Sequence, residues 1–460
     1  MMRPVVRPAA RLCVLLASIA PAFGQTPPAE HTETWPDGTL RERYSVDADG
    51  NRHGIHEVFA PNGTKTLSET LVHGHKDGPY REWREDGRPF CALNYRNDVL
   101  HGLCRTFHDN GEPATTGNYD AGVRTGRWTE TDAGGERTRI AEFRNGELHG
   151  QVRVLQKSRV LSRQVWKSGE LVNLDGLEPF PVARDALLRE LRGILGTEVL
   201  ADPKDPKAGL RQAALLRLRA YRQLCGLPQR EMQLSTQWSE LCDAAAEVCR
   251  RNGNIDHHPP QPPGVDDAQY KAAQQGASHS NLAIGGSVVD SVDSYMDDSD
   301  PSNIERIGHR RWCLNPLMKK TGFGTDGSFH AMWSMDESGK LPHGFDATYY
   351  PPRGWVPVDL FEAHRAFSIA SSKGGAPKAD DLRAVVRPLD DDWLPGEPLA
   401  IDSLHAAPPG YGTGTCIVFR AAAIDVQPGK RYSVEVSVDG GKTLAHRYVV
   451  AFCEPVLAAK

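Results

Sequence analysis

The sequence predicts a multidomain protein with an N-terminal array of β-strand repeats, a central region of helices and strands, and a β-rich C-terminal region. Three observations support this prediction. Glycines recur every 24 residues near the N-terminus, amphipathic helical patterns occupy the middle, and short alternating apolar segments dominate the end. With 460 residues, 39% of them apolar and 25% charged, the chain is long enough for several globular domains.

The first residues are typical of a cleavable signal peptide. Basic residues precede a short apolar run, Leu12–Ala22, and small residues stand at Ala22 and Gly24. This pattern predicts cleavage before Gln25, so that residues 1–24 are removed. We therefore expect a secreted or periplasmic protein, with no transmembrane segment in the mature chain.

The net charge argues against nucleic acid as a partner, and the cysteine content allows disulfide bonds. A formal net charge of −5 gives no electrostatic footprint for nucleic acid. Eight cysteines follow the signal peptide, and an oxidising compartment permits disulfides among them. The best candidates are Cys91 with Cys104 and Cys416 with Cys453, which lie in or near expected strands; buried free thiols are the alternative.

A repeat with a fixed period occupies residues 31–155. Asn62-Gly63, Asp86-Gly87 and Asn110-Gly111 are hairpin turn dipeptides one period apart, because glycine accepts a positive φ. One hairpin cannot bury its apolar face alone, so neighbouring hairpins must stack into a continuous sheet. A second glycine series keeps the same step: Gly54, Gly78, Gly102, Gly126 and Gly150. Trp83 and Phe107 take equivalent positions, which we expect to point inward.

The segments "HKDGPYREWREDG" and "RNDVLHGLCRTFHDNG" resemble the variant MORN repeats of bacterial proteins that are often labelled antitoxin-like. The resemblance implies a binding or spacer surface rather than a catalytic one, with an unknown protein, envelope or lipid partner. The array also carries several histidines, which we expect to be solvated turn residues, with a metal role as the alternative: His53, His73, His75, His101, His108 and His149.

Residues 156–208 are expected to form a linker that contains one amphipathic helix at 183–195. The central domain, 209–337, then opens with a helix over 210–225. Ser235 can cap the next helix, and a third apolar pattern starts at Val288. The segment 323–335 alternates around glycine, which favours a strand and a hairpin.

The segments "LLRLRAYRQLCGLP", "HHPP", "SNLAIGG", "YMDD" and "GHRRWCLNP" follow one another in this region. In that order they resemble the CAP superfamily of cysteine-rich secretory, antigen 5 and pathogenesis-related 1 proteins, in its divergent bacterial branch. The resemblance implies a small α-β-α sandwich, with helices on both faces of a short sheet.

The resemblance also implies a cleft with two histidines and two acids. His309 matches the second histidine, and His257 or His258 matches the first; we prefer His258, which directly precedes a proline. Ser280 stands where one family acid is expected, and Asp297 or Asp298 stands for the other. The candidate ligand-binding residues are therefore His258, His309, Ser280 and Asp298.

His258 and His309 could ligate zinc through neutral imidazole nitrogens, with a carboxylate or water completing the coordination. The alternative is that His309 only fixes its loop, while Arg310 and Arg311 pair with nearby aspartates; at least one arginine should face water or an acid. Because Ser280 replaces an acid, we expect an exported binding protein for a small ligand, lipid or metal, and assign no catalytic residue. A CAP-like hydrolase, such as a metal-dependent peptidase, is the competing hypothesis.

The C-terminal region, 341–460, contains several short alternating segments, including "RYSVEVSV" and "HRYVVAF". Short strands with intervening turns favour a β-sandwich of immunoglobulin-like type. We expect this region to provide support or binding.

Overall fold

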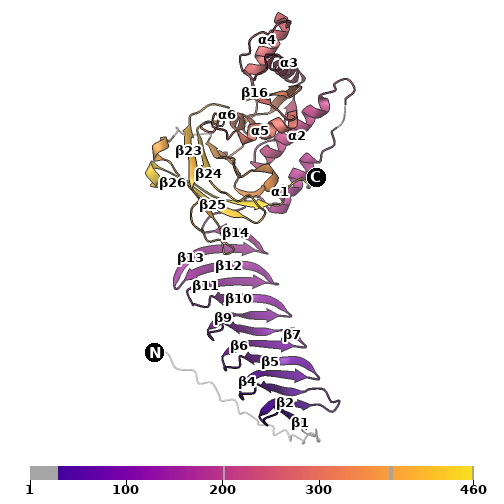
Figure 1. Cartoon of the computed structure of the whole chain (residues 1–460), viewed down its shortest axis with the longest axis vertical. Coiled ribbons are helices and arrows are strands. Elements are labelled where there is room, and N and C mark those ends of the chain that lie inside the picture. Colours follow the sequence, from indigo (N-terminus) through magenta and orange to yellow (C-terminus); the bar gives the residue numbers. More distant parts are fainter. Residues whose placement is uncertain (1–28, 200–201, 372–376, 458–460) are drawn as a thin grey trace, which may run out of the picture. The chain divides into compact units, whose positions relative to one another are not determined.

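The computed structural model describes residues 29–199, 202–371 and 377–457. The predicted signal peptide, 1–24, lies outside this part of the chain. Contacts divide the chain into two units: the first runs to Glu136 and includes Phe143–Gly146, and the second comprises Arg137–Glu142 and the chain from Glu147 onward. The sequence correctly predicts a multidomain, mostly β protein, with an N-terminal antiparallel sheet, a helix-containing middle and C-terminal sheets (Figure 1).

The N-terminal sheet has 14 strands in up-and-down order, with the short β7 off this path and paired with β6. Strands β13 and β14 lie beyond residue 155, in the stretch expected to be a linker. The strands are β1 (Ala29–Thr34), β2 (Leu40–Val46), β3 (Gly54–Phe59), β4 (Lys65–Val72), β5 (His75–Trp83), β6 (Pro89–Arg96), β7 (Val99–Leu100), β8 (Gly102–Phe107), β9 (Pro113–Asp120), β10 (Val123–Thr131), β11 (Arg137–Arg144), β12 (Glu147–Gln156), β13 (Arg159–Lys167) and β14 (Glu170–Leu174).

The hairpin turns fall at the Asn-Gly and Asp-Gly pairs, as the sequence predicts. Gly63 and Gly87 have φ angles of 82° and 84°. Their N–H groups donate to the carbonyls of Ala60 and Arg84, at 2.9 Å in both turns. Residues that carry a side chain rarely adopt this backbone conformation, so the recurring glycines favour a turn at these positions.

Trp128 is buried to 1% exposure, whereas Trp83 and Phe107 are only half-buried. The strand register shifts directly before Trp83 and directly before Phe107. Such an irregularity re-aims the side chain that follows it. The two residues thus take equivalent positions, as predicted, but neither is fully buried. The Trp128 ring packs against Gly117, where a Cβ would lie 2.1 Å from the ring.

A polar cluster is buried where β2, β3 and β4 meet. His56 is 4% exposed, and its Nδ1 lies 2.8 Å from Glu69 Oε1 while its Nε2 lies 2.7 Å from Glu42 Oε1. The hydrogen bond from His56 lowers the pKa of the Glu69 carboxyl, and the charge of Lys76 adds to the effect against the opposing effect of burial. The ionised Glu69 therefore stabilises this part of the array.

We expect the array to lose stability on acidification below about pH 4.5, the ordinary pKa of a glutamate side chain. A carboxyl whose pKa is lower in the folded chain stabilises the fold above its unfolded pKa, and this stabilisation is lost as the pH falls through the folded pKa. Thermal melts of the full chain from neutral to acidic pH measure the effect. The variant Glu69→Gln should show a flatter decline, and parallel curves for the two proteins would contradict the role of Glu69.

The second unit continues with α1 (Arg184–Leu195), which confirms the helix expected at 183–195. Its buried residues, Leu187, Leu188 and Leu191, have the predicted helical spacing. Together with residues of α2 they contribute to one large hydrophobic cluster that reaches Val456. The C-terminal region therefore shares its core with the helices.

Helices and a four-stranded sheet of order β15-β17-β18-β16 form the central region. Ser235 caps α3 as expected, accepting a hydrogen bond from the Trp238 N–H. Helix α4 was not predicted, because its buried residues are only Ala273, Gly276 and Ala277, which give no strong apolar period. The elements are α2 (Ala208–Leu224), β15 (Gln233–Leu234), α3 (Thr236–Asn252), α4 (Asp267–Ser278), β16 (Ser280–Ile284), α5 (Val288–Asp297), α6 (Gly308–Cys313), β17 (Lys320–Asp326) and β18 (Phe329–Trp333).

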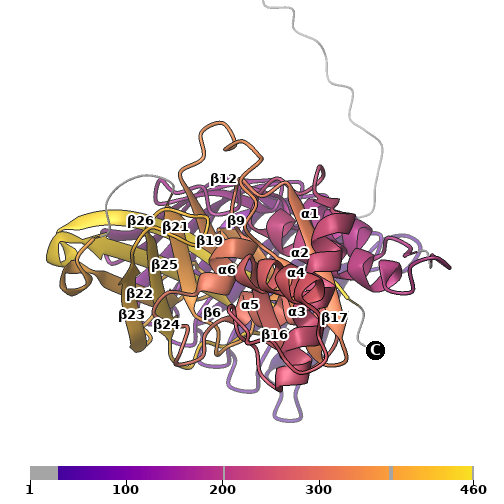
Figure 2. The same cartoon turned by 90° about the horizontal axis from the view of Figure 1, so that it is seen from above.

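The C-terminal strands form two four-stranded sheets, of orders β19-β21-β24-β23 and β20-β26-β25-β22. Side chains of both sheets enter the same hydrophobic cluster, including Phe419 and Phe452. Viewed from above, α6 lies between α5 and the strands β23 and β24 (Figure 2). The strands are β19 (Ala347–Tyr350), β20 (Gly354–Pro357), β21 (Phe367–Ser371), β22 (Arg383–Pro388), β23 (Ile401–Ala407), β24 (Cys416–Ala421), β25 (Arg431–Val438) and β26 (Thr443–Cys453).

Neither expected disulfide is present: all eight cysteines in the described part of the chain are free thiols. Cys91 lies opposite Thr106 in the β6–β8 ladder, so Cys104 is its diagonal and not its direct neighbour. Diagonal neighbours are typically about 7–8 Å apart, which is beyond the usual span of a disulfide. Cys416 and Cys453 lie in different sheets and in separate hydrophobic clusters. Within the same described ranges, no helix has the length and apolar character to cross a membrane.

Candidate functional site

Asp298 and His309 form a hydrogen-bonded pair between α5 and α6. Asp298 ends α5 with a left-handed backbone (φ 44°), which places its carboxylate beside the first turn of α6. Oδ1 lies 2.9 Å from His309 Nδ1, and Oδ2 accepts the backbone N–H of His309 at 2.9 Å. The carboxylate is almost fully buried, and the His309 side chain keeps 26% of its surface exposed. The pair therefore has a fixed acid and an accessible ring.

Residues of β16 and α5 hold His309 on its other sides. Asn281 Nδ2 donates to the carbonyl oxygen of His309 at 3.0 Å, and the Tyr295 ring lies 5.8 Å from the imidazole. The Tyr295 hydroxyl in turn donates to the carbonyl of Asn281 at 3.1 Å. Because Asp298 takes Nδ1, Nε2 is the ring nitrogen that can meet a ligand.

His309 lines a cavity of about 420 Å³. Apolar and polar groups share its wall: Ile255, Asp256, His257, Ser278, Ser280, Asn281, Leu282, Asn303, Arg306, Gly308, His309, Trp312, Met335 and Tyr411. The cavity falls within the size range of small-molecule sites. Its wall combines helical, strand and loop segments from Ile255 to Tyr411.

The histidine on this wall besides His309 is His257, not the preferred His258. The Nδ1 of His257 lies 2.9 Å from the carbonyl of Ala277, which turns its ring toward the end of α4. His258 is exposed, does not line the cavity, and gives its backbone N–H to Asp256 Oδ1. Of these two consecutive residues, the geometry therefore favours His257 over the preferred His258 as the histidine of the cavity.

Ser280 lines the cavity but is only 2% exposed. Its hydroxyl lies 3.4 Å from the sulfur of Cys242. Burial raises the pKa of Cys242 to about 12, so this sulfur stays a neutral thiol. Ser280 therefore contributes a neutral group at the position where the resemblance leads one to expect an acid.

The zinc prediction gains no support from the geometry of the cleft. Across the described ranges, one group of three potential metal ligands comes together, and it consists of Asp47, His53 and His73 in the array. Neither His258 nor His309 belongs to it, and the Nδ1 of His309 is already engaged by Asp298.

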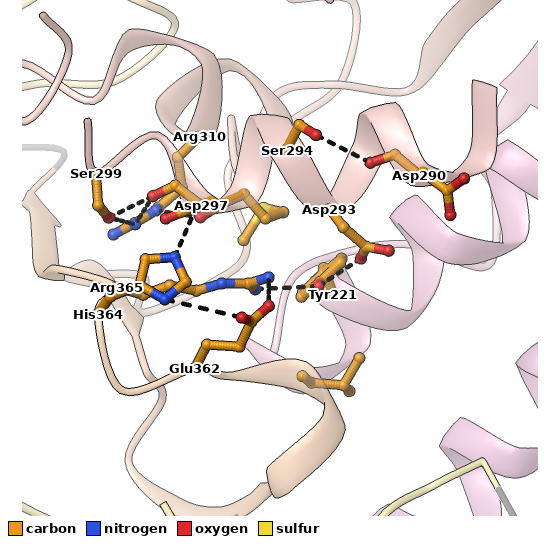
Figure 3. Close-up of polar contacts among 12 residues, drawn as sticks. Tyr221, Asp290, Asp293, Ser294, Asp297, Ser299, Arg310, Glu362, His364 and Arg365 are labelled. Atoms are coloured by element: carbon orange, nitrogen blue, oxygen red, sulfur yellow. Dashed lines mark hydrogen bonds and ion pairs between the residues drawn. The ribbon is translucent and has the colours of Figure 1, made fainter. Parts of the chain in front are cut away.

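Arg310 is fully buried without a carboxylate partner. It donates to the carbonyl oxygens of Met296 (2.7 Å), Ala366 (2.6 Å) and Asp297, and to the hydroxyl of Ser299. Figure 3 shows the contacts with Asp297 and Ser299, and shows His364 paired with the Asp297 side chain. Desolvation lowers the pKa of Arg310.

Arg311 is 2% exposed and is held by the loop between β23 and β24. It donates to the carbonyls of Pro408, Gly410 and Gly414 at 2.7–2.9 Å, and its guanidinium lies 5.1 Å from the Tyr411 ring centroid. The prediction that one of the two arginines faces water or pairs with an acid is therefore wrong, because backbone carbonyls solvate both.

Comparison with known proteins adds no assignment: no family model matches the chain, and no curated protein matches it in sequence.

Two further cavity residues carry no sequence signal that identifies them as part of the site. Tyr411 belongs to the C-terminal region, and its ring stands where a Cβ on Gly308 would approach it to 2.8 Å. Met335 follows β18 and lines the same cavity. Tyr411 reaches the cleft because Arg311 holds its loop, a contact between segments about a hundred residues apart.

Proposed function

We propose that the chain is an exported binding protein whose CAP-like central region, an α-β-α sandwich, holds a small ligand in the cavity at His309. We propose further that the MORN-like array presents a surface to a protein or envelope partner. The observation that supports ligand binding is the pairing of His309 with the buried Asp298 on the wall of a cavity of about 420 Å³.

The pair defines the chemistry of the ligand. Asp298 accepts a hydrogen bond from the Nδ1–H group, so the Nε2 of the neutral ring is an acceptor. A ligand hydroxyl or amide N–H satisfies it. Leu282, Trp312 and Met335 line the same cavity and can cover an apolar body. The ligand is accordingly a small, largely apolar molecule with at least one hydrogen-bond donor.

One observation favours hydrolysis as the second candidate function. A histidine oriented by a buried carboxylate is the arrangement that general-base catalysis uses to activate water or a hydroxyl group. Against it, the Ser280 hydroxyl contacts Cys242 rather than His309, and Ser278 Oγ lies 3.0 Å from His279 Nδ1. Neither serine is placed as a nucleophile for His309, and binding is the better-supported function.

Ligand-observed NMR with a library of neutral aryl alcohols and amides tests the proposal. We expect His309→Ala to weaken the binding of hits to the full chain at least tenfold. Asp298→Asn should weaken it less, since the imidazole remains but loses its fixed tautomer. His258→Ala is the matched control, because this neighbouring histidine lies off the cavity, and it should change nothing.

Two results would count against the binding proposal. Hits whose affinity is unchanged in His309→Ala would place the ligand elsewhere. Turnover of ester or peptide probes that is abolished in His309→Ala and kept in His258→Ala would instead establish the hydrolase.

A further inference from the structure

We infer that Asp47, His53 and His73, in the first turns of the array, form a binding site for a divalent transition-metal ion, with zinc the best fit. One ligand atom from each residue lies within 4.8 Å of those of the other two. Two imidazoles and one carboxylate are a donor set that zinc takes with a water in the fourth position. The site belongs to the first unit and is independent of the cleft at His309.

The backbone positions each donor. Asp47 starts the turn after β2, and its Oδ1 accepts the N–H groups of Asp49 and Asn51 at 3.0 and 2.9 Å. Those bonds fix the carboxylate and leave Oδ2, which lies 2.7 Å from His73 Nδ1. His53 follows the bridge between Val46 and Arg52, and its ring centroid is 5.1 Å from that of His73.

Little movement is needed to bring the donors around an ion. Tetrahedral zinc with bonds near 2.1 Å places its ligand atoms about 3.4 Å apart. The His73 side chain keeps 64% of its surface exposed, so its ring can rotate, while Asp47 is largely buried and fixed. The neighbouring guanidinium of Arg52 is engaged by Glu42 Oε1 at 2.7 Å and by the face of Tyr44.

Comparison of equivalent positions in successive repeats shows that only one repeat carries all three donors. Steps of 24 residues from His73 lead to Asn97, Ala121 and Asn145, all with the same left-handed backbone. The same steps from Asp47 lead to apolar or aromatic residues, namely Leu71, Tyr95, Tyr119 and Phe143, and steps from His53 lead to Asp77, His101, Thr125 and His149. The three donors coincide in the first unit alone, so the repeat pattern does not account for them.

An ion at this site would join the turn after β2 to the turn between β4 and β5. Terminal units of a repeat array lack one neighbour and need additional stabilisation. The expected consequence of metal binding is therefore a higher melting temperature of the array.

Calorimetric titration of zinc into the full chain, purified without a polyhistidine tag and freed of metal with a chelator, tests the inference. We expect one zinc ion per chain at this site and at least a tenfold loss of affinity in His73→Asn. That variant introduces the residue found at 97 and 145 on the same backbone, so it should fold normally, which circular dichroism verifies. Asp47→Asn should also weaken binding.

The controls separate this site from the other histidines. His101→Thr alters an array histidine that also faces an aspartate, and His309→Ala alters the cleft; both should bind zinc as the parent does. Absence of zinc binding by the parent, equal binding by the parent and His73→Asn, or loss of all binding in His309→Ala would each overturn the inference.

Discussion

Truncating Trp128 to alanine should destabilise the array by about 3–5 kcal/mol, the usual cost of removing a large buried aromatic side chain. Its ring is 1% exposed, packs edge-on against Tyr119 at 5.1 Å, and donates from Nε1 to the carbonyl of Asn118 at 3.2 Å. Gly117 leaves the space that the ring fills, so the surrounding strands cannot easily close over the cavity. Chemical denaturation of the full chain, followed by circular dichroism, measures the loss.

Trp83→Ala is the matched control for this prediction. Trp83 belongs to the same repeats but is half-buried, with the Lys65 ammonium 6.0 Å from its ring centroid. It should lose clearly less stability than Trp128→Ala. Equal losses of stability in the two variants would contradict the prediction that the burial of Trp128 makes it the more important core residue of the array.

Replacing Arg310 with methionine should lower the free energy of unfolding of the second unit by about 3–5 kcal/mol. The substitution leaves the carbonyl groups of Met296, Ala366 and Asp297 buried without this donor, and each orphaned group costs about 1–3 kcal/mol. Methionine fills much of the volume, so the loss reports the hydrogen bonds rather than a cavity. Urea denaturation followed by circular dichroism gives the difference.

Arg306→Met provides the comparison, since Arg306 is exposed and contacts Asn303 at 3.1 Å. We expect its effect to stay within about 0.5 kcal/mol, as for other surface positions. A similar small effect for Arg310→Met would show that the buried guanidinium contributes no net stability.

The elements that the sequence predicts well are those set by local patterns. The glycine period locates the turns of the array because positive φ is a property of single residues. Helices α1, α2, α3 and α5 follow from apolar spacing, and Ser235 marks the start of α3. Helix α4 has no such pattern, because its buried face consists of alanine and glycine.

The site could be predicted only in part. The chain supplies Asp298 and His309 where the resemblance leads one to expect them, and the structure pairs them. The choice between His257 and His258 depends on which way one loop residue points, which spacing alone does not determine. The surroundings of Arg310 and Arg311 depend on backbone carbonyls, which every residue carries and no sequence pattern distinguishes. The incomplete burial of Trp83 and Phe107 could not be predicted, because it depends on register shifts that residue types do not reveal. These shifts recur with the repeat, before Phe59 and Leu155 as well as before Trp83 and Phe107.

The loop that carries Tyr411 contributes to the shape of the cavity but not to the pair formed by Asp298 and His309. Asp298 and His309 come from one short segment of the chain, whereas Tyr411 comes from a loop between two strands. Arg311 holds that loop through three main-chain carbonyls and the Thr413 hydroxyl. Side chains of that loop other than Thr413 can therefore change without loss of these hydrogen bonds. Evolution could retune which molecule fits by editing the loop, while the histidine and its acid stay as they are.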